Sequence, residues 1–132
     1  MSIYAIGTNY WRLLNSDDPL RPGELSLTTD NIESAVIDHA AGIARDRTPQ
    51  EILTWTKAAK LASIRAEAKT RIESSYPQWR QLDAALGLLP DAYTTQMRVE
   101  IAAIIEASNT AEDVVDAATT IESVNAVEAV WP

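Results

Sequence analysis

"TPQEILTWTKAAKLASIRAEAKTRIESSYPQWRQLDAALGLLP", residues 48–90, decides the fold because it holds the longest stretch of helical spacing in the chain. Thr48, Pro49 and Glu51 form a strong start signal, with an N-cap hydroxyl, a first-turn proline and a carboxylate that reaches back. The spacing predicts a helix over about 49–76, roughly 42 Å long at about 1.5 Å per residue. Its apolar stripe consists of Leu53, Leu61, Ile64, Ala68 and Ile72. So long a helix in a small protein is expected to protrude or to pack against neighbours.

Pro77 is expected to end this helix, because a residue before proline avoids helical geometry. A shorter helix follows and ends near Gly87. We expect Trp79 to pack back across the corner, while Arg80 and Gln81 satisfy carbonyls left at the helix end. The segment "YPQWRQ" is therefore interpreted as a hinge between two helices.

Further helices are expected towards the C-terminus, over about 78–131. Asp91 caps one helix, and a restart is predicted at Thr110. A last short helix ends before Trp131 and Pro132. The apolar residues on these helices are Met97, Ile101, Ile104, Ile105, Val114, Val115, Val124, Val127 and Val130.

Residues 1–30 predict a small β arm of three short strands, separated by turn signals such as Pro22-Gly23. From Asp30 the spacing becomes helical, with Glu33 completing a capping box. The residues that share the expected helical face are Ile32, Val36, Ala40 and Ile43. The predicted fold class is mainly α, with a short antiparallel β arm at the N-terminus, then a long helix and a small helical bundle. The expected domains are residues 1–30 and 31–132.

The composition is that of a folded globular protein, with 46% hydrophobic and 23% charged residues among 132. The absence of cysteine excludes disulfides and thiolate chemistry. Neither a signal peptide nor an apolar run long enough to span a membrane is expected. The net charge of −8 opposes non-specific binding to nucleic acid. Most basic residues lie within 45–80 and none follows Arg98, so the basic middle and the acidic tail are expected to attract one another, within a chain or between copies.

No residue set predicts catalysis, a cofactor or a metal ion. His39 lies near the apolar face of the helix expected from Asp30, where a packing role is favoured over a catalytic one. The carboxylate pairs Asp17-Asp18 and Asp113/Asp116 are interpreted as a turn and a first helical turn. The basic helix face flanks the apolar stripe on both sides, which favours side-chain stems covering apolar surface over a nucleic-acid site.

The four tryptophans are more informative, because Trp combines a large apolar body with one N–H group that needs a partner. Three of them, Trp11, Trp79 and Trp131, lie beside an element boundary or near the end of the sequence. Either all four, including Trp55, pack within the chain, or some of them anchor contacts between subunits.

The stretch "IRAEAKTRIESSYPQWRQLDAAL", with Ala107-Ser108-Asn109 and the final Trp131-Pro132, resembles a family of tailed-phage proteins. In these tail-fibre assembly or tail-fibre-associated proteins, a helix of the type R/K-x-x-A-x-x-R-I leads into P-x-W-K/R-Q. The resemblance covers roughly residues 58–132 and departs from the family at Asp83, where Asn is common. The matching positions in the first part are Arg65, Ala68, Arg71, Ile72, Pro77, Trp79, Arg80 and Gln81.

The resemblance implies a non-enzymatic protein of the virion tail, assembled in the host cytoplasm. Its expected role is that of a connector associated with the tail fibre or baseplate, which contacts other tail proteins and forms homo-oligomers. The alternatives are a tail-fibre assembly chaperone that leaves the particle, and a small enzyme of unknown chemistry. The candidate contact residues are Tyr10, Trp11, Trp55, Arg65, Lys69, Arg71, Trp79, Arg80 and Trp131.

Overall fold

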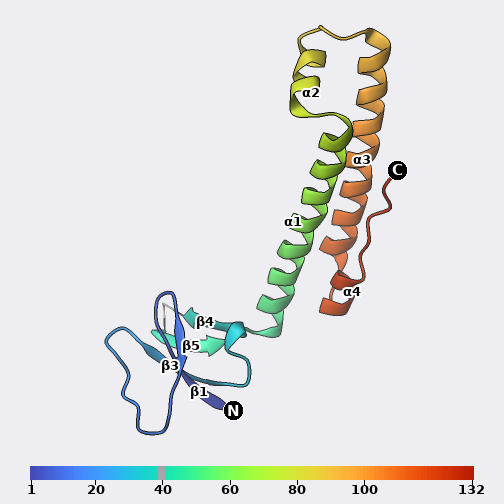
Figure 1. The fold of residues 1–132 in the computed structure, drawn as a ribbon. Helices are drawn as coiled ribbons and strands as arrows, with labels where there is room; N and C mark the ends of the chain where they lie inside the picture. Colours follow the sequence, from blue (N-terminus) through green and yellow to red (C-terminus); the bar gives the residue numbers. More distant parts are fainter. Residues whose placement is uncertain (39–40) are drawn as a thin grey trace. The chain divides into compact units, whose positions relative to one another are not determined.

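In the computed structural model, which describes residues 1–38 and 41–132, three N-terminal strands form one antiparallel sheet (Figure 1). They are β1 (Ser2–Ile6), β2 (Trp11–Leu13) and β3 (Leu25–Thr29), and β1 is the central strand. In this register Tyr4 lies between Leu13 and Leu27. Because side chains alternate between the two faces of a strand, Ile6 and Leu27 lie on one face, where both are buried. The three predicted strands are confirmed.

The helix predicted from Asp30 is wrong. The chain forms a short 3-10 helix, η1 (Ile32–Ser34), and then an antiparallel pair, β4 (Ala35–Asp38) and β5 (Ile43–Asp46). Ala44 is buried together with Ile6 and Leu27 of the first sheet, so the burial of strand side chains overrides the helical spacing. The side chains that pack against this core are Leu25, Ile32, Ala35 and Ile37.

The long helix is confirmed as α1 (Pro49–Ser75), and its start shows the expected capping box. The backbone N–H of Glu51 donates to Oγ1 of Thr48, and the N–H of Thr48 donates to the Glu51 carboxylate, both at 3.2 Å. The second helix, α2 (Gln78–Ala85), begins directly after Pro77 and ends before Gly87. Gly87 has a φ of +75°, the left-handed conformation that favours glycine after a helix.

The restart predicted at Thr110 is wrong, because α3 (Asp91–Ala117) is a single helix. Across the expected break, the buried residues Ser108, Ala111 and Val115 follow one another at intervals of three and four, and Met97 lies eleven residues before Ser108, so all four share one face of the helix. The last helix, α4 (Ile121–Asn125), is shorter than expected, and residues 126–132 follow it without helical structure.

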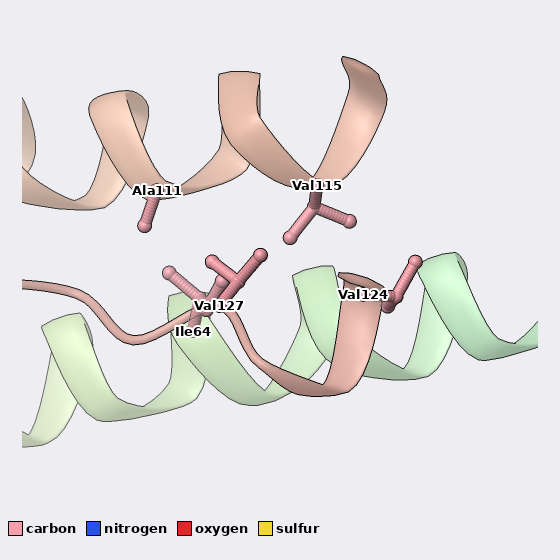
Figure 2. Close-up of a cluster of buried hydrophobic side chains, with 5 residues drawn as sticks. All are labelled: Ile64, Ala111, Val115, Val124 and Val127. Carbon is pink, nitrogen blue, oxygen red and sulfur yellow. The ribbon is translucent and has the colours of Figure 1, made fainter. Parts of the chain in front are cut away.

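The chain divides into two units, Met1–Ile52 and Leu53–Pro132, so the boundary lies in the first turn of α1 and not at residue 30. The strand region followed by helices matches the expected order. In the second unit, α1 and α3 run side by side and residues 126–132 lie along them (Figure 1). Figure 2 shows the core of this unit, where Ile64 of α1 meets side chains from α3, from α4 and from residues 126–132. The core residues are Ile64, Ala111, Val115, Val124 and Val127.

A second cluster of buried side chains, Tyr76, Ala84 and Met97, lies where α1, α2 and α3 meet. Each unit thus contains its own buried cluster, as an independently packed region requires. Within the described part of the chain, no helix has the length and hydropathy of a membrane-spanning segment.

Candidate functional site

The corner between α1 and α2 is held by hydrogen bonds and aromatic packing. Nε2 of Gln81 donates to the backbone carbonyl of Tyr76 at 2.7 Å, so the expected role of Gln81 is confirmed. The buried ring of Tyr76 packs edge-on against Tyr93, with 6.0 Å between ring centroids. Its hydroxyl donates to the Glu100 carboxylate. The corner is therefore closed mainly by Tyr76, not by Trp79.

Trp79 points away from this core and is 58% exposed, so the expectation that its ring packs back across the corner is wrong. The positions that face inwards are Tyr76 and Ala84. The Arg80 guanidinium lies over two rings, 4.6 Å from the centroid of Trp79 and 5.4 Å from that of Tyr93. Arg80 thereby joins the exposed indole to the buried corner through cation–π contacts.

Three leucines extend the exposed apolar surface of Trp79 along α2 and into the following turn. Leu82, Leu86 and Leu88 are 59%, 63% and 68% exposed. Trp79, Leu82 and Leu86 are spaced at i, i+3 and i+7, which puts them on one side of the helix. We name Trp79, Leu82, Leu86 and Leu88 the α2 stripe. The leucines were not among the contact residues predicted from the sequence. Their spacing on the side of the helix opposite the small residue Ala84 was the signal in the sequence that could have indicated them.

The candidate cations on α1 are paired within the chain. Arg65 forms an ion pair with Glu112 of α3. Lys69 lies 3.9 Å from Glu73, and Arg71 lies 3.0 Å from Glu67. The attraction expected between the basic middle and the acidic tail is thus seen within one chain, at the Arg65–Glu112 pair.

The C-terminal segment packs on α1 through Trp131. The Arg71 guanidinium carbon lies 5.0 Å from the centroid of the Trp131 ring, which is half-buried against the core around Ile64. Beside this segment, a groove of about 550 Å³ is lined by α3 residues such as Ala107 and by the tail up to Pro132. Trp131 is therefore chiefly an intrachain contact, and its neighbour Val130 is exposed.

Trp55, near the start of the second unit, is 60% exposed on α1. Trp11 of the edge strand β2 is 54% exposed, and its ring packs against Tyr4 in an edge-to-face pair at 5.4 Å. Together with Trp79, these residues present three large indoles to solvent. The structure therefore divides the tryptophans, with Trp131 packed within the chain and the other three mainly at the surface.

Tyr10, the remaining aromatic candidate, has a structural contact in the first unit. Its hydroxyl donates to the buried carboxylate of Glu24 at 2.8 Å. The Arg12 guanidinium donates to both oxygens of Glu24, at 3.1 and 2.9 Å, and the backbone N–H of Arg21 adds a bond of 2.8 Å. The Arg12 hydrogen bonds, then the Arg21 N–H, lower the pKa of Glu24 to about 2.

The ring of Tyr10 lies so close to the backbone of residue 7 that this position requires glycine. A Cβ built on Gly7 would collide with the ring of Tyr10, so only glycine leaves room for the ring at this position. The backbone N–H of Gly7 also donates to the carbonyl of Tyr10 at 2.9 Å. The cluster of Tyr10, Arg12 and Glu24 thus ties β2 and the turn before it to the turn before β3, and its chemistry is structural.

Within residues 1–38 and 41–132, no group of three or more His, Asp or Glu side chains is placed so that it could hold a metal ion. Asp18 accepts the N–H of Asn15 at 3.0 Å, consistent with the predicted turn. Asp113 lies near the C-terminal end of α3 and not in a first turn. His39 lies outside the described residues.

No protein-family model matches the chain, and comparisons with curated proteins and with solved structures likewise return no significant match.

Proposed function

We propose that this protein is a non-enzymatic structural component of a tailed-phage virion, a connector associated with the tail fibre or baseplate. The observation that carries the proposal is the exposure of Trp11, Trp55 and Trp79, which are all more than half accessible. Tryptophan is enriched among the residues that dominate protein–protein contacts, because it buries a large apolar area with few rotatable bonds. The resemblance around Pro77 and Trp79 supplies the class of partner.

The placement of the candidates supports a connector role. Trp11 belongs to the first unit and Trp79 to the second, so each unit has an exposed indole of its own. A protein that joins two others needs at least one contact surface for each of them. The cations Arg65 and Arg71 are paired within the chain, so the proposed contacts rest on the aromatic and apolar side chains.

A tail-fibre assembly chaperone that leaves the particle is the second candidate. Each unit has its own buried cluster, which suits a protein that is stable without its client. The two roles differ in their fate during assembly, since a connector stays in the particle and a chaperone is released.

Mass spectrometry of purified virions tests the proposal. We expect peptides of this chain in mature particles, in constant proportion to the tail-fibre protein. Their absence from mature particles, with the chain bound to fibre protein in infected lysates, would establish the chaperone. Absence from both would contradict both roles.

A matched pair of variants tests the contact surface of the first unit. We expect Trp11→Ala to lower incorporation into particles while the purified protein keeps its fold. Ile43→Ala is the control, because Ile43 is an exposed apolar residue of the same unit that was not a candidate. Equal incorporation of the two variants would remove Trp11 from the proposed surface.

A further inference from the structure

The α2 stripe gathers, within ten residues of sequence, four of the nine exposed large hydrophobic side chains of the second unit. Its four members, each at least 58% exposed, lie on one short helix and the turn that follows it. From the spacing and exposure of these side chains, we infer that the α2 stripe is a self-association surface, which pairs with the same stripe of a second copy. This inference deepens the proposed function, because it names one contact surface and its occupant.

The charge around the stripe favours a second copy as the occupant. Residues 77–99 contain two basic residues, Arg80 and Arg98, and two acidic residues, Asp83 and Asp91, so that their net charge is 2 − 2 = 0. The whole chain carries a net charge of −8. Glu73 and Glu100, which accept hydrogen bonds from Gln78 and Tyr76, border this segment and bring the local charge to −2. Two copies therefore meet less repulsion here than at residues 101–132, which hold six acidic and no basic residues, since charges further than about 10 Å away are largely screened at 0.1 M salt.

The area of the stripe sets the strength of the pairing. Four such side chains expose on the order of 400 Å² of apolar surface, which is the size of a functional patch on a monomer. Two stripes together contribute roughly 800 Å², less than the ~1,200–2,000 Å² buried in a stable complex. The expected dimer is weak and forms at micromolar or higher concentrations, until other contacts of the assembly hold it.

The order of side chains along α2 gives the geometry of the pair. In an antiparallel arrangement about a two-fold axis midway between Trp79 and Leu86, and so close to Leu82, Trp79 meets Leu86 of the second copy and Leu82 lies beside Leu82 of the second copy. The large ring thus lies opposite a branched aliphatic side chain at both ends of the contact. Such a surface is complementary to itself, as a two-fold contact requires.

Sedimentation velocity over a concentration series tests the association with the full chain. We expect wild-type protein to shift from monomer to dimer with increasing concentration. Leu82→Glu puts two like charges close to the two-fold axis, and we expect it to raise the dissociation constant at least about tenfold. Val99→Glu is the matched control, because it changes the charge equally at an exposed apolar position of α3 outside the stripe.

Disulfide crosslinking tests the geometry, because the chain has no cysteine of its own. Under oxidising conditions we expect Leu82→Cys to form a covalent dimer rapidly, and Val99→Cys to remain monomeric. Circular dichroism of each variant establishes that it is folded.

Two results would overturn the inference: a wild-type chain that stays monomeric up to millimolar concentration, or Leu82→Glu and Val99→Glu variants that dimerise equally. Neither result bears on whether the chain is found in virions, so failure of this inference is separable from failure of the proposed function.

Discussion

The hydroxyl of Tyr76, directly after α1, donates a hydrogen bond to the Glu100 carboxylate on α3. The two residues are 24 positions apart, and their contact closes the corner at which α2 is inserted between the long helices. The hydrogen bond to Glu100, together with burial, raises the pKa of Tyr76 to about 12. The same hydrogen bond, with one from Gln96, lowers the pKa of Glu100.

The stability of the second unit should therefore fall at alkaline pH. The pKa of Tyr76 is about 12 in the folded chain against 10.0 for an unperturbed tyrosine, so the neutral phenol favours folding. This contribution is complete below about pH 10 and is lost as the pH rises towards about 12. Denaturant titrations followed by circular dichroism should show less loss of stability over this range for Tyr76→Phe than for wild type. Tyr93→Phe, which keeps the Tyr76–Glu100 bond, should behave as wild type, and identical profiles for all three proteins would contradict the assignment.

The first unit should lose stability in acid through Glu24. Its folded-state pKa of about 2 lies below the 4.5 of an unperturbed glutamate, so the ionised carboxylate favours folding. The contribution is complete above about pH 4.5 and is lost as the pH falls towards about 2. Glu24→Gln should lower protection of β1 amides against hydrogen exchange at neutral pH and reduce the further loss in acid. Glu33→Gln removes an exposed carboxylate from the same unit and should leave the exchange rates of β1 unchanged.

Trp79→Ala should destabilise the chain only slightly, because the ring is more than half exposed. The loss of its cation–π contact with Arg80 is expected to cost about 0.5–1 kcal/mol of unfolding free energy. Met97→Ala, at a position only 5% exposed in the adjacent cluster, should cost about 2–5 kcal/mol. Thermal and denaturant unfolding of both variants measures the difference. A loss for Trp79→Ala as large as that for Met97→Ala would mean that the indole is buried in solution.

Substitution of two adjacent valines on α3 distinguishes the effect of core packing on stability from the effect of helix propensity. Val115 is fully buried in the core of Figure 2, whereas Val114 is 53% exposed. Val115→Ala should lower the free energy of unfolding by about 1.5–3 kcal/mol through lost burial and a residual cavity. Val114→Ala makes the same chemical change and should stay within about 0.5 kcal/mol of wild type. Similar values for the two variants would contradict the assigned face of α3.

Three expectations that depended on local chemistry agree with the structure. Thr48 and Glu51 cap each other at the start of α1, Pro77 separates α1 from α2, and Gly87 follows α2 in the left-handed conformation. Each of these signals acts through backbone groups within a few residues of itself, so it can be read without knowledge of the remaining fold.

The expectations that failed depended on distant partners. The segment from Ile32 to Asp46 has an apolar spacing compatible with both a helix and a strand pair, and the burial of Ala44 with Ile6 and Leu27 selects the strands. Asn109 and Thr110 look like a helix start, but Ala111 and Val115 continue the buried face of α3 against α1. In both places packing between distant segments outweighs a local signal of about 1 kcal/mol.

The candidate contact residues divide in the same way. The sequence by itself determined which aromatic and basic residues were candidates for contacts between proteins, because residue type and position beside a helix end are local properties. Only the tertiary structure decided that Tyr10 and Trp131 contact their own chain, that Arg65 is paired with Glu112, and that Trp79 faces solvent. Whether a side chain is buried depends on which segments fold back over it, and residues far away in the sequence determine that.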